Sequence, residues 1–211
     1  MIVVIDYGSG NLRSVAKALE SVGGRVRVSH DEGEMAQATH LVLPGVGAFA
    51  DCYRNLTESR LLDPMLAHIR AGRPFLGICV GMQLLFTEGH EFGVHPGLNL
   101  IPGRVEGFSK TMADPEDAGR LLKVPHMGWN PVHQAVTHPL WREIPDGAHF
   151  YFVHSFYARP EEDAVVAGRS QYGIGFAAAV ARDNLFATQF HPEKSQRHGL
   201  RLLHHFVEWR P

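Results

Sequence analysis

Cysteine is scarce in this chain, with two residues among 211, and the two form no C-x-x-C pair. Such a sequence has neither a disulfide framework nor a cysteine-rich zinc cluster to hold its fold together. Free thiols persist where the surroundings are reducing. We therefore expect a cytoplasmic protein whose cysteines remain available for chemistry.

Long apolar runs and an excess of charge are also missing. No apolar run reaches about 18 residues, and the apolar start ends at Asp6 without the basic flank of a signal peptide, so we expect no membrane span. The net charge of -2 and pI of about 6.7 provide no electrostatic basis for binding nucleic acid. No repeat, low-complexity tract or linker divides the sequence, so we expect one domain over residues 1–211.

Strand and helix patterns alternate through the first part of the chain. Buried-strand patterns occur at residues 2–6, 25–30, 40–45 and 74–79. Helical patterns occur at residues 11–23, in the region that ends at Gly72, and at residues 81–89. This spacing implies right-handed crossovers and a parallel sheet that is covered on both faces.

The second part of the chain is typical of shorter strands. Runs rich in β-branched and aromatic residues occur at residues 104–108, 121–130, 149–158, 164–170, 175–184 and 185–193. The polar residues 111–119 predict an exposed loop, and Ser195 is placed to cap a final helix. We therefore predict an α/β fold: a three-layer α/β/α domain with a mostly parallel central sheet and an antiparallel extension.

Cys79 lies where the strand at residues 74–79 meets the next helix, and Gly77 and Gly81 bracket it. In such an elbow the central side chain is lifted out of the carboxyl edge of the sheet, and strand and helix approach too closely for a Cβ atom at the bracketing positions. The free N–H groups of the new helix favour a thiolate. Most unpaired cysteines are instead small buried hydrophobes, and this describes Cys52, which has no glycine bracket. The pattern predicts that Cys79 is a nucleophile.

A nucleophilic cysteine needs a base, and the base needs an orienting group. Among 14 histidines, His191 is the one that ends an apolar strand, with Glu193 two residues further on. In extended backbone both side chains would project from the same side, so the carboxylate would hold the imidazole in one tautomer. A polar strand end explains this segment as well when it is taken alone. Paired with Cys79, the segment predicts a base and its orienting acid.

Several of these segments resemble known proteins. Residues 77–86 and 191–195 are similar to the class I, or triad-type, glutamine amidotransferases. Within that class, residues 41–49, 124–130 and 151–157 resemble the glutaminase subunits of imidazole glycerol phosphate synthases. The resemblance implies a flavodoxin-like fold that hydrolyses L-glutamine through a Cys79–His191–Glu193 triad and a γ-glutamyl thioester. It implies no cofactor, and no residue pattern requires a metal.

The resemblance also assigns the oxyanion hole. One donor would be the backbone N–H of Val80, and another would come from the loop of Gly45, Val46 and Gly47, which in this family is associated with a peptide flip that completes the hole. A tight turn would by itself account for both glycines of the loop.

The substrate and partner residues follow from the same resemblance. Gln83 and the backbone around Ser155 and Phe156 would bind glutamine, although Gln83 also fits an exposed helix position and His154 a hydrogen-bonded core position. The ammonia would pass to a (β/α)₈-barrel synthase subunit that this chain lacks. The docking residues would be Asn11, Met127, Trp129 and Lys194, although Trp129 fits core packing as well.

Three other interpretations remain open at this point. The chain could be a glutaminase subunit of another synthase, such as the one that makes pyridoxal phosphate, or a cysteine peptidase or thiol sensor. It could also be a non-catalytic flavodoxin-like module, with residues 6–11 as a phosphate-binding loop. The glycine segment at residues 44–47 and residues 124–130 argue against the first, and the His-x-Glu pair argues against the second. Residues 6–11 lack the full G-x-G-x-x-G spacing that the third requires.

Overall fold

The computed structural model describes residues 1–114 and 117–211, and its first part alternates strand and helix as expected. The elements in order are β1 (Ile2–Ile5), α1 (Leu12–Ser21), β2 (Val26–Ser29), α2 (Glu32–Gln37), β3 (His40–Gly45), α3 (Phe49–Glu58), α4 (Leu62–Arg70), β4 (Phe75–Cys79) and α5 (Val80–Gln83). Every residue of β1, β3 and β4 is buried. These strands are continuous apolar runs because both faces of a parallel sheet are covered.

The second part consists mainly of strands. Its elements are β5 (Phe86–Gly89), β6 (His95–Pro96), β7 (Ile101–Gly107), β8 (Ala113–Asp114), β9 (Asp117–Leu121), β10 (His126–Gln134), β11 (Ala148–His154), β12 (Phe156–Pro160), β13 (Val166–Tyr172), β14 (Ile174–Arg182), β15 (Leu185–Thr188) and α6 (Gln196–Glu208). Three single 3-10 turns lie between them: η1 (Pro139–Trp141), η2 (Asp163–Val165) and η3 (Pro192–Lys194).

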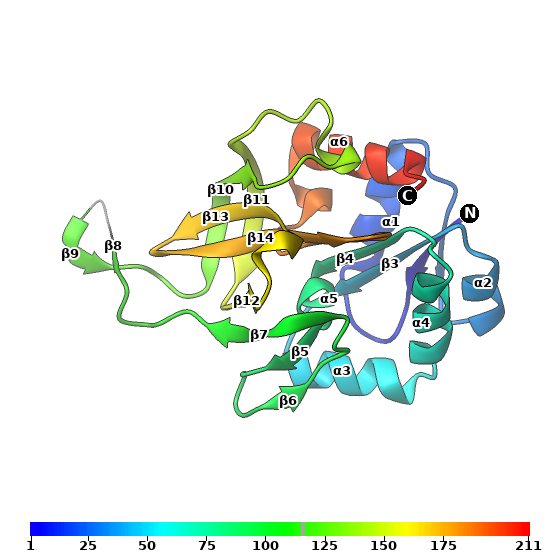
Figure 1. The fold of residues 1–211 in the computed structure, drawn as a ribbon, viewed down its shortest axis with the longest axis horizontal. Helices are drawn as coiled ribbons and strands as arrows, with labels where there is room; N and C mark the ends of the chain where they lie inside the picture. The colour runs from blue at the N-terminus through cyan, green and yellow to red at the C-terminus, as the bar shows by residue number, and fades with distance from the viewer. Residues whose placement is uncertain (115–116) are drawn as a thin grey trace.

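One large sheet joins the two parts, and helices pack on both of its faces (Figure 1). Its path is β2-β1-β3-β4-β15-β14-β12-β7-β5-β6, and β13 leads from β14 to β10 and β11. Strands β2, β1, β3, β4 and β15 run parallel, whereas β14 and β12 are antiparallel to their neighbours. The predicted three-layer α/β fold with an antiparallel extension is therefore confirmed.

Two local predictions were wrong. Residues 81–89 form only the end of the short α5 and then strand β5, because residues 82–86 are all buried and so carry no helical period. Ala113–Asp114 and Asp117–Leu121 form the paired strands β8 and β9, which project from the body of the molecule in Figure 1, where a loop was expected. The part of the loop expectation at residues 115–116 lies outside the described residues.

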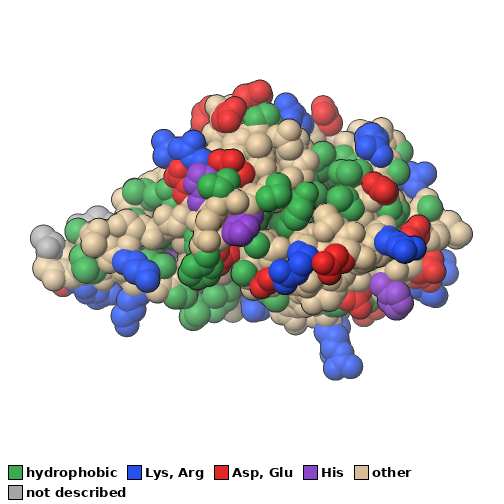
Figure 2. All heavy atoms as spheres, turned by 90° about the horizontal axis from the view of Figure 1, so that it is seen from below, with side chains coloured by type: hydrophobic (Ala, Val, Ile, Leu, Met, Phe, Trp, Pro, Cys, Tyr) green, Lys and Arg blue, Asp and Glu red, His purple; other side chains and the backbone are tan. Residues whose placement is uncertain are grey.

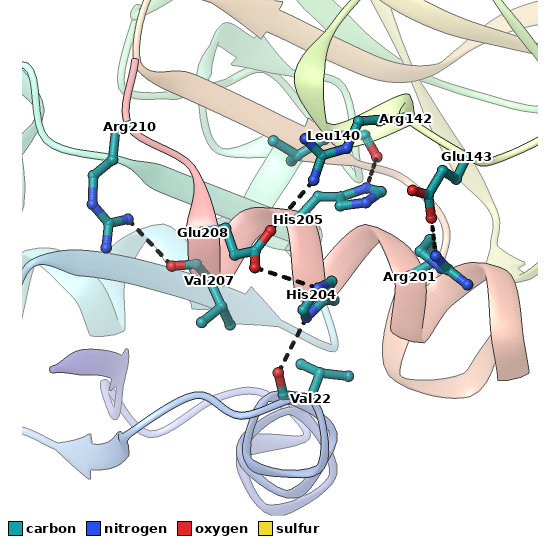
Figure 3. Close-up of polar contacts among 10 residues, drawn as sticks. All are labelled: Val22, Leu140, Arg142, Glu143, Arg201, His204, His205, Val207, Glu208 and Arg210. Atoms are coloured by element: carbon teal, nitrogen blue, oxygen red, sulfur yellow. Dashed lines mark hydrogen bonds and ion pairs between the residues drawn. The ribbon is translucent and has the colours of Figure 1, made fainter.

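Helix α6 holds η3, the turn that precedes it, in place through contacts with other parts of the fold. Glu208 accepts a hydrogen bond from Arg142, and its other carboxylate oxygen lies 3.5 Å from His204 Nε2. His204 also contacts the carbonyl of Val22 at the end of α1 (Figure 3). Arg201 pairs with Glu143 beside η1. These exposed contacts add little energy singly, but they fix α6, and with it η3, against the sheet.

Ser195 does not cap α6 as predicted. Its hydroxyl donates to the carbonyl of His191 at 2.6 Å and accepts from the N–H of Tyr151 at 2.9 Å. The side chain therefore joins η3 to β11 and is 1% exposed. The sequence pattern of a cap was correct, but a buried strand N–H competed for the same oxygen.

The surface carries charges of both signs between hydrophobic side chains on the face shown in Figure 2. In the part of the chain that the structure describes, no helix combines the length and the apolar character needed to cross a membrane.

Candidate active site

Cys79 occupies the sharp turn between β4 and α5. Its φ of +56° and ψ of -112° lie in a region that costs an L-residue about 1–3 kcal/mol. Parallel pairing places Cys79 beside Gly45, at the carboxyl ends of β4 and β3. The thiol therefore lies at the edge of the sheet where such folds bind ligands, as the elbow pattern predicts.

The glycines around Cys79 are required by close packing. A Cβ on Gly81 would be driven into the carbonyl oxygen of Leu43 on the neighbouring strand. A Cβ on Gly77 would come within 2.8 Å of the carbonyl oxygen of Gly81, and one on Gly45 within 2.8 Å of the backbone nitrogen of Gly81. The predicted steric reason for the glycine bracket is confirmed, and it extends to Gly45.

His191 and Glu193 meet beside this elbow. The distance between His191 Nδ1 and Glu193 Oε1 is 2.9 Å, and the two side chains are 4% and 0% exposed. Their backbone differs from the prediction, because β15 ends at Thr188 and Pro192–Lys194 form the turn η3. The turn, rather than a shared side of an extended strand, brings the carboxylate to the imidazole.

The electrostatics of the pair favour a charged imidazole. Burial disfavours the cation of His191, but the sulfur of Cys79 and the carboxylate of Glu193 outweigh this effect and raise its pKa to about 10. Nε2 of His191 has no hydrogen-bond partner among the described residues. The cavity at the elbow is lined by both Cys79 and His191, so the imidazole and the sulfur face the same space.

This cavity has a volume of about 380 Å³, enough for a small amino acid. It is lined by Val46, Gly47, Cys79, Val80, Gln83, Glu91, Pro125, Val153, His154, Ser155, Phe156, His191 and Lys194. The structure thus brings nine of the predicted site residues together in the lining of one cavity. Asn11, Gly45, Met127, Trp129 and Glu193 are not part of this lining.

The loop after β3 is held by a neighbouring loop. Val46 receives a hydrogen bond at its carbonyl oxygen from Ser9 Oγ at 2.7 Å, and its N–H donates to the same hydroxyl at 3.4 Å. The thiol of Cys52 donates to that carbonyl at 3.4 Å. Residues 6–11, considered above as a phosphate loop, thus pack against this loop, and Cys52 does more than fill the core.

Gln83 is buried rather than exposed, so its alternative interpretation as a surface residue is wrong. Its amide nitrogen donates to the carbonyl of Phe156 at 3.1 Å and to Gln189 Oε1 at 3.0 Å. His154 is also buried, and it contacts the same carbonyl at 2.8 Å. The Ser155–Phe156 backbone is therefore fixed at the cavity wall from two sides.

The residues assigned to a partner surface lie on β10, in η3 and directly before α1. Met127 and Trp129, on β10, are 62% and 45% exposed, so core packing does not explain Trp129. Lys194 lies over the ring of Tyr151 at 5.9 Å and also lines the cavity. Asn11 precedes α1, which contacts η3.

Two residues near Cys79 or in the cavity wall were not predicted from the sequence. Glu91 contributes an acidic side chain to the lining of the cavity. Its Oε2 accepts a hydrogen bond from the backbone N–H of Phe49 at 2.7 Å. Gln189 donates to the sulfur of Cys79 at 3.8 Å. The position of Gln189, two residues before His191, could have indicated that it lies at the site. Glu91 lies in a turn without a motif, so nothing in the sequence pointed to it.

No metal centre is evident. Within residues 1–114 and 117–211, no group of three His, Cys, Asp or Glu side chains is placed to hold an ion.

The sequence matches the family model "Glutamine amidotransferase class-I" over residues 3–209. The chain therefore belongs to the class I glutamine amidotransferases. A solved structure titled "Structure of PurLQS from Thermotoga maritima" shares the fold, with a TM-score of 0.73, 17% identity, and coverage of 98% of this chain and 97% of that one.

Relatives within the class are much closer. The chain is 56% identical to "Imidazole glycerol phosphate synthase subunit HisH" of Syntrophotalea carbinolica, covering 98% of each chain. It is 55% identical to the subunit of the same name from Geobacter metallireducens, covering 98% of this chain and 97% of the relative. Within the class, the chain thus falls among the HisH subunits.

Proposed function

We propose that this protein is the glutaminase subunit of an imidazole glycerol phosphate synthase. It hydrolyses L-glutamine to glutamate and ammonia, and a (β/α)₈-barrel synthase subunit uses the ammonia to make imidazole glycerol phosphate and an aminoimidazole carboxamide ribotide in histidine biosynthesis. The observation that carries the proposal is the placement of Cys79 and His191 in one cavity, with Glu193 bonded to the imidazole at 2.9 Å. The similarity to HisH subunits supports the choice of synthase.

In the first step, the Cys79 thiolate attacks the side-chain carboxamide carbon of glutamine and forms a C–S bond. His191 begins as an imidazolium, which its raised pKa favours, and it donates this proton to the departing ammonia as the C–N bond breaks. The product is a γ-glutamyl thioester. Glu193 stabilises the imidazolium and keeps Nε2 directed at the cavity.

In the second step, His191 takes a proton from a water molecule that attacks the thioester. The C–S bond then breaks, glutamate is released and the Cys79 thiolate is restored beside the imidazolium. Both steps pass through an oxyanion, for which each preorganised N–H donor contributes about 3 kcal/mol.

Val80 at the start of α5 supplies one donor in this proposal, and the Gly45–Gly47 loop supplies the other. The N–H of Val46 is engaged with Ser9 at 3.4 Å. We therefore infer that a turn of the Val46 peptide away from Ser9 precedes full activity. Gly47, with φ of +98°, gives the loop a backbone conformation that such a turn needs.

Glutamine binding follows from the charge of the cavity wall. Its α-ammonium needs an anion, and Glu91 provides a carboxylate at the wall. Its α-carboxylate would contact the backbone at Ser155 and Phe156, which line the same cavity. Because both amide hydrogens of Gln83 are engaged, this side chain offers only its oxygen to a ligand.

Free ammonia is mostly ammonium at neutral pH, so its direct passage to a partner preserves the nucleophile. Exposed Met127 and Trp129, together with Lys194 and Asn11, supply the docking face for the barrel subunit. The free thiols of Cys52 and Cys79 fit a reducing compartment, for which we propose the cytoplasm. Because one sheet runs through both parts of the chain, we propose that residues 1–211 act as a single domain.

Three assays test this function: glutamine hydrolysis by the purified chain alone, with the barrel subunit, and with that subunit plus its ribotide ligand. We expect low turnover alone, strong stimulation in the ternary mixture, and loss of activity in all three for Cys79→Ala. Circular dichroism of the variant checks its fold. Equal turnover in the three mixtures would overturn the partner proposal, and activity that survives Cys79→Ala would overturn the nucleophile.

A further inference from the structure

The nucleophile has a hydrogen-bond donor that the mechanism above does not use. Gln189 Nε2 lies 3.8 Å from the sulfur of Cys79. Gln189 is 0% exposed and Cys79 is 5% exposed, so little water competes for this contact. An N–H directed at a sulfur stabilises the thiolate more than the thiol, because the charged acceptor forms the stronger bond.

The oxygen and nitrogen of an amide are told apart by their partners, and here the partners leave one choice. The carbonyl of Phe156 can only accept, so Gln83 directs its nitrogen at it, at 3.1 Å. The second N–H of Gln83 then donates to Gln189 Oε1 at 3.0 Å. Gln189 is thus left with its nitrogen toward Cys79.

A second chain of hydrogen bonds holds the Phe156 carbonyl in place. His154 Nδ1 lies 2.8 Å from this oxygen, and its Nε2 lies 2.9 Å from His126 Nδ1. Nε2 of His126 contacts the amide nitrogen of Asn130 at 3.3 Å, and that nitrogen also donates to the carbonyl of Gln171 at 2.7 Å.

The direction of this second chain is also determined. Both of its ends are carbonyl oxygens, which only accept, so each neutral imidazole donates through Nδ1 and accepts through Nε2. Burial lowers the pKa of His126 to about 4 and that of His154 to about 3, which keeps both rings neutral. The carbonyl that orients Gln83 is therefore anchored to β10.

We propose that Gln189 is a further catalytic residue, whose amide N–H stabilises the Cys79 thiolate and is held in that orientation by Gln83 and the Phe156 carbonyl. This inference rests on the proposed function, because it concerns the same nucleophile. It assigns Gln83 a positioning role in addition to any contact with glutamine.

The test is the pH dependence of alkylation of Cys79 by iodoacetamide in the full chain, followed by mass spectrometry of the peptide that contains Cys79. Gln189→Met removes the donor, and we expect the midpoint of the pH profile to rise by about one unit, which is a tenfold loss of thiolate below the midpoint. Gln189→Glu keeps the side-chain length and the bond from Gln83 but places a negative oxygen at the sulfur. We expect a larger rise for this variant.

Thr188→Val is the matched control, because it removes a buried hydroxyl that bonds to the carbonyl of Phe190 on the same segment. Its profile should coincide with that of the wild type. Coincident profiles for the wild type and both Gln189 variants would overturn the inference while leaving Cys79 reactive. A wild-type Cys79 that reacts no faster than a free cysteine peptide would instead count against the proposed function itself.

Discussion

His191 depends on the charges of the two side chains beside it. Its imidazole is buried, so the cation would be costly without compensation. The carboxylate of Glu193, which is 0% exposed, has the imidazole as its hydrogen-bond partner at 2.9 Å. A buried pair of this kind is retained for its chemistry rather than for stability, because desolvation cancels much of the attraction.

Replacing Glu193 by Gln separates orientation from charge. The amide oxygen can still accept from Nδ1, but it no longer stabilises the imidazolium, so the pKa of His191 should fall and kcat for glutamine hydrolysis should drop roughly 100-fold. Kinetics in the activated complex measure the rate, and an NMR titration of His191 measures the pKa.

The chain offers a matched control in His90 and Glu88. These two residues form the same type of pair at 2.7 Å, but their side chains are 35% and 39% exposed. Glu88→Gln should leave the rate unchanged. An unaltered rate in Glu193→Gln would mean that Glu193 does not support the base.

At the scale of elements, the elbow between β4 and α5 depends on how closely α5 approaches β3. Gly81 lies against the carbonyl of Leu43, and Gly45 against the backbone nitrogen of Gly81. These contacts join two parallel strands and a helix through backbone atoms, which cannot move aside as side chains can.

Gly81→Ala is therefore expected to destabilise the protein by more than about 4 kcal/mol, or to prevent folding, because its methyl group would overlap the Leu43 oxygen. Urea unfolding measures the loss. The control is Gly119→Ala in β9, where, among the described residues, a Cβ would meet only Asp117 Oδ1 at 3.6 Å. It should change stability by less than about 0.5 kcal/mol. Equal stability of the two variants would contradict this account of the elbow.

The whole molecule contains several histidines that the fold keeps neutral. Burial lowers the pKa of His126 and His138 to about 4 and that of His154 to about 3. Burial and the Arg210 guanidinium lower that of His40 to about 4. In the unfolded chain each of these groups titrates near its ordinary value of about 6.5.

Between these two pKa values the unfolded chain binds protons that the folded protein does not. The contribution of these four histidines to stability should therefore be full above pH 6.5 and fall as the pH is lowered toward 4, by up to about 1.4 kcal/mol per pH unit for each fully buried imidazole. Urea unfolding at pH 6.5 and pH 5 measures the effect, because the raised pKa of His191 acts in the opposite direction only above pH 6.5. Equal stability at the two pH values would show that the four histidines titrate freely.

His138→Asn provides the comparison for this measurement. His138 Nδ1 accepts from the N–H of Leu140 at the start of η1, and an asparagine oxygen can accept in its place. The variant should keep its stability at pH 6.5 and lose less than the wild type at pH 5. If the variant loses as much stability as the wild type between the two pH values, His138 does not contribute to the pH dependence.

How much was predictable from sequence depended on the range of the interaction. The Gly77–Cys79–Gly81 elbow and the pairing of His191 with Glu193 involve residues at most four apart, and short-range geometry suffices to predict them. The helix predicted for residues 81–89 was wrong because the short buried apolar run within it has neither a helical nor a strand period.

The sequence by itself therefore determined the α/β class, and it predicted the Cys79 elbow and the pairing of His191 with Glu193, since each depends on local backbone geometry or on hydrophobic period. Only the tertiary structure decided which distant groups surround them. The bond from Gln189 to Cys79 spans 110 positions, that from Gln83 to Phe156 spans 73, and that from Ser9 to Val46 spans 37. Such contacts follow from strand order and register, because adjacent parallel strands bring remote segments to one edge of the sheet.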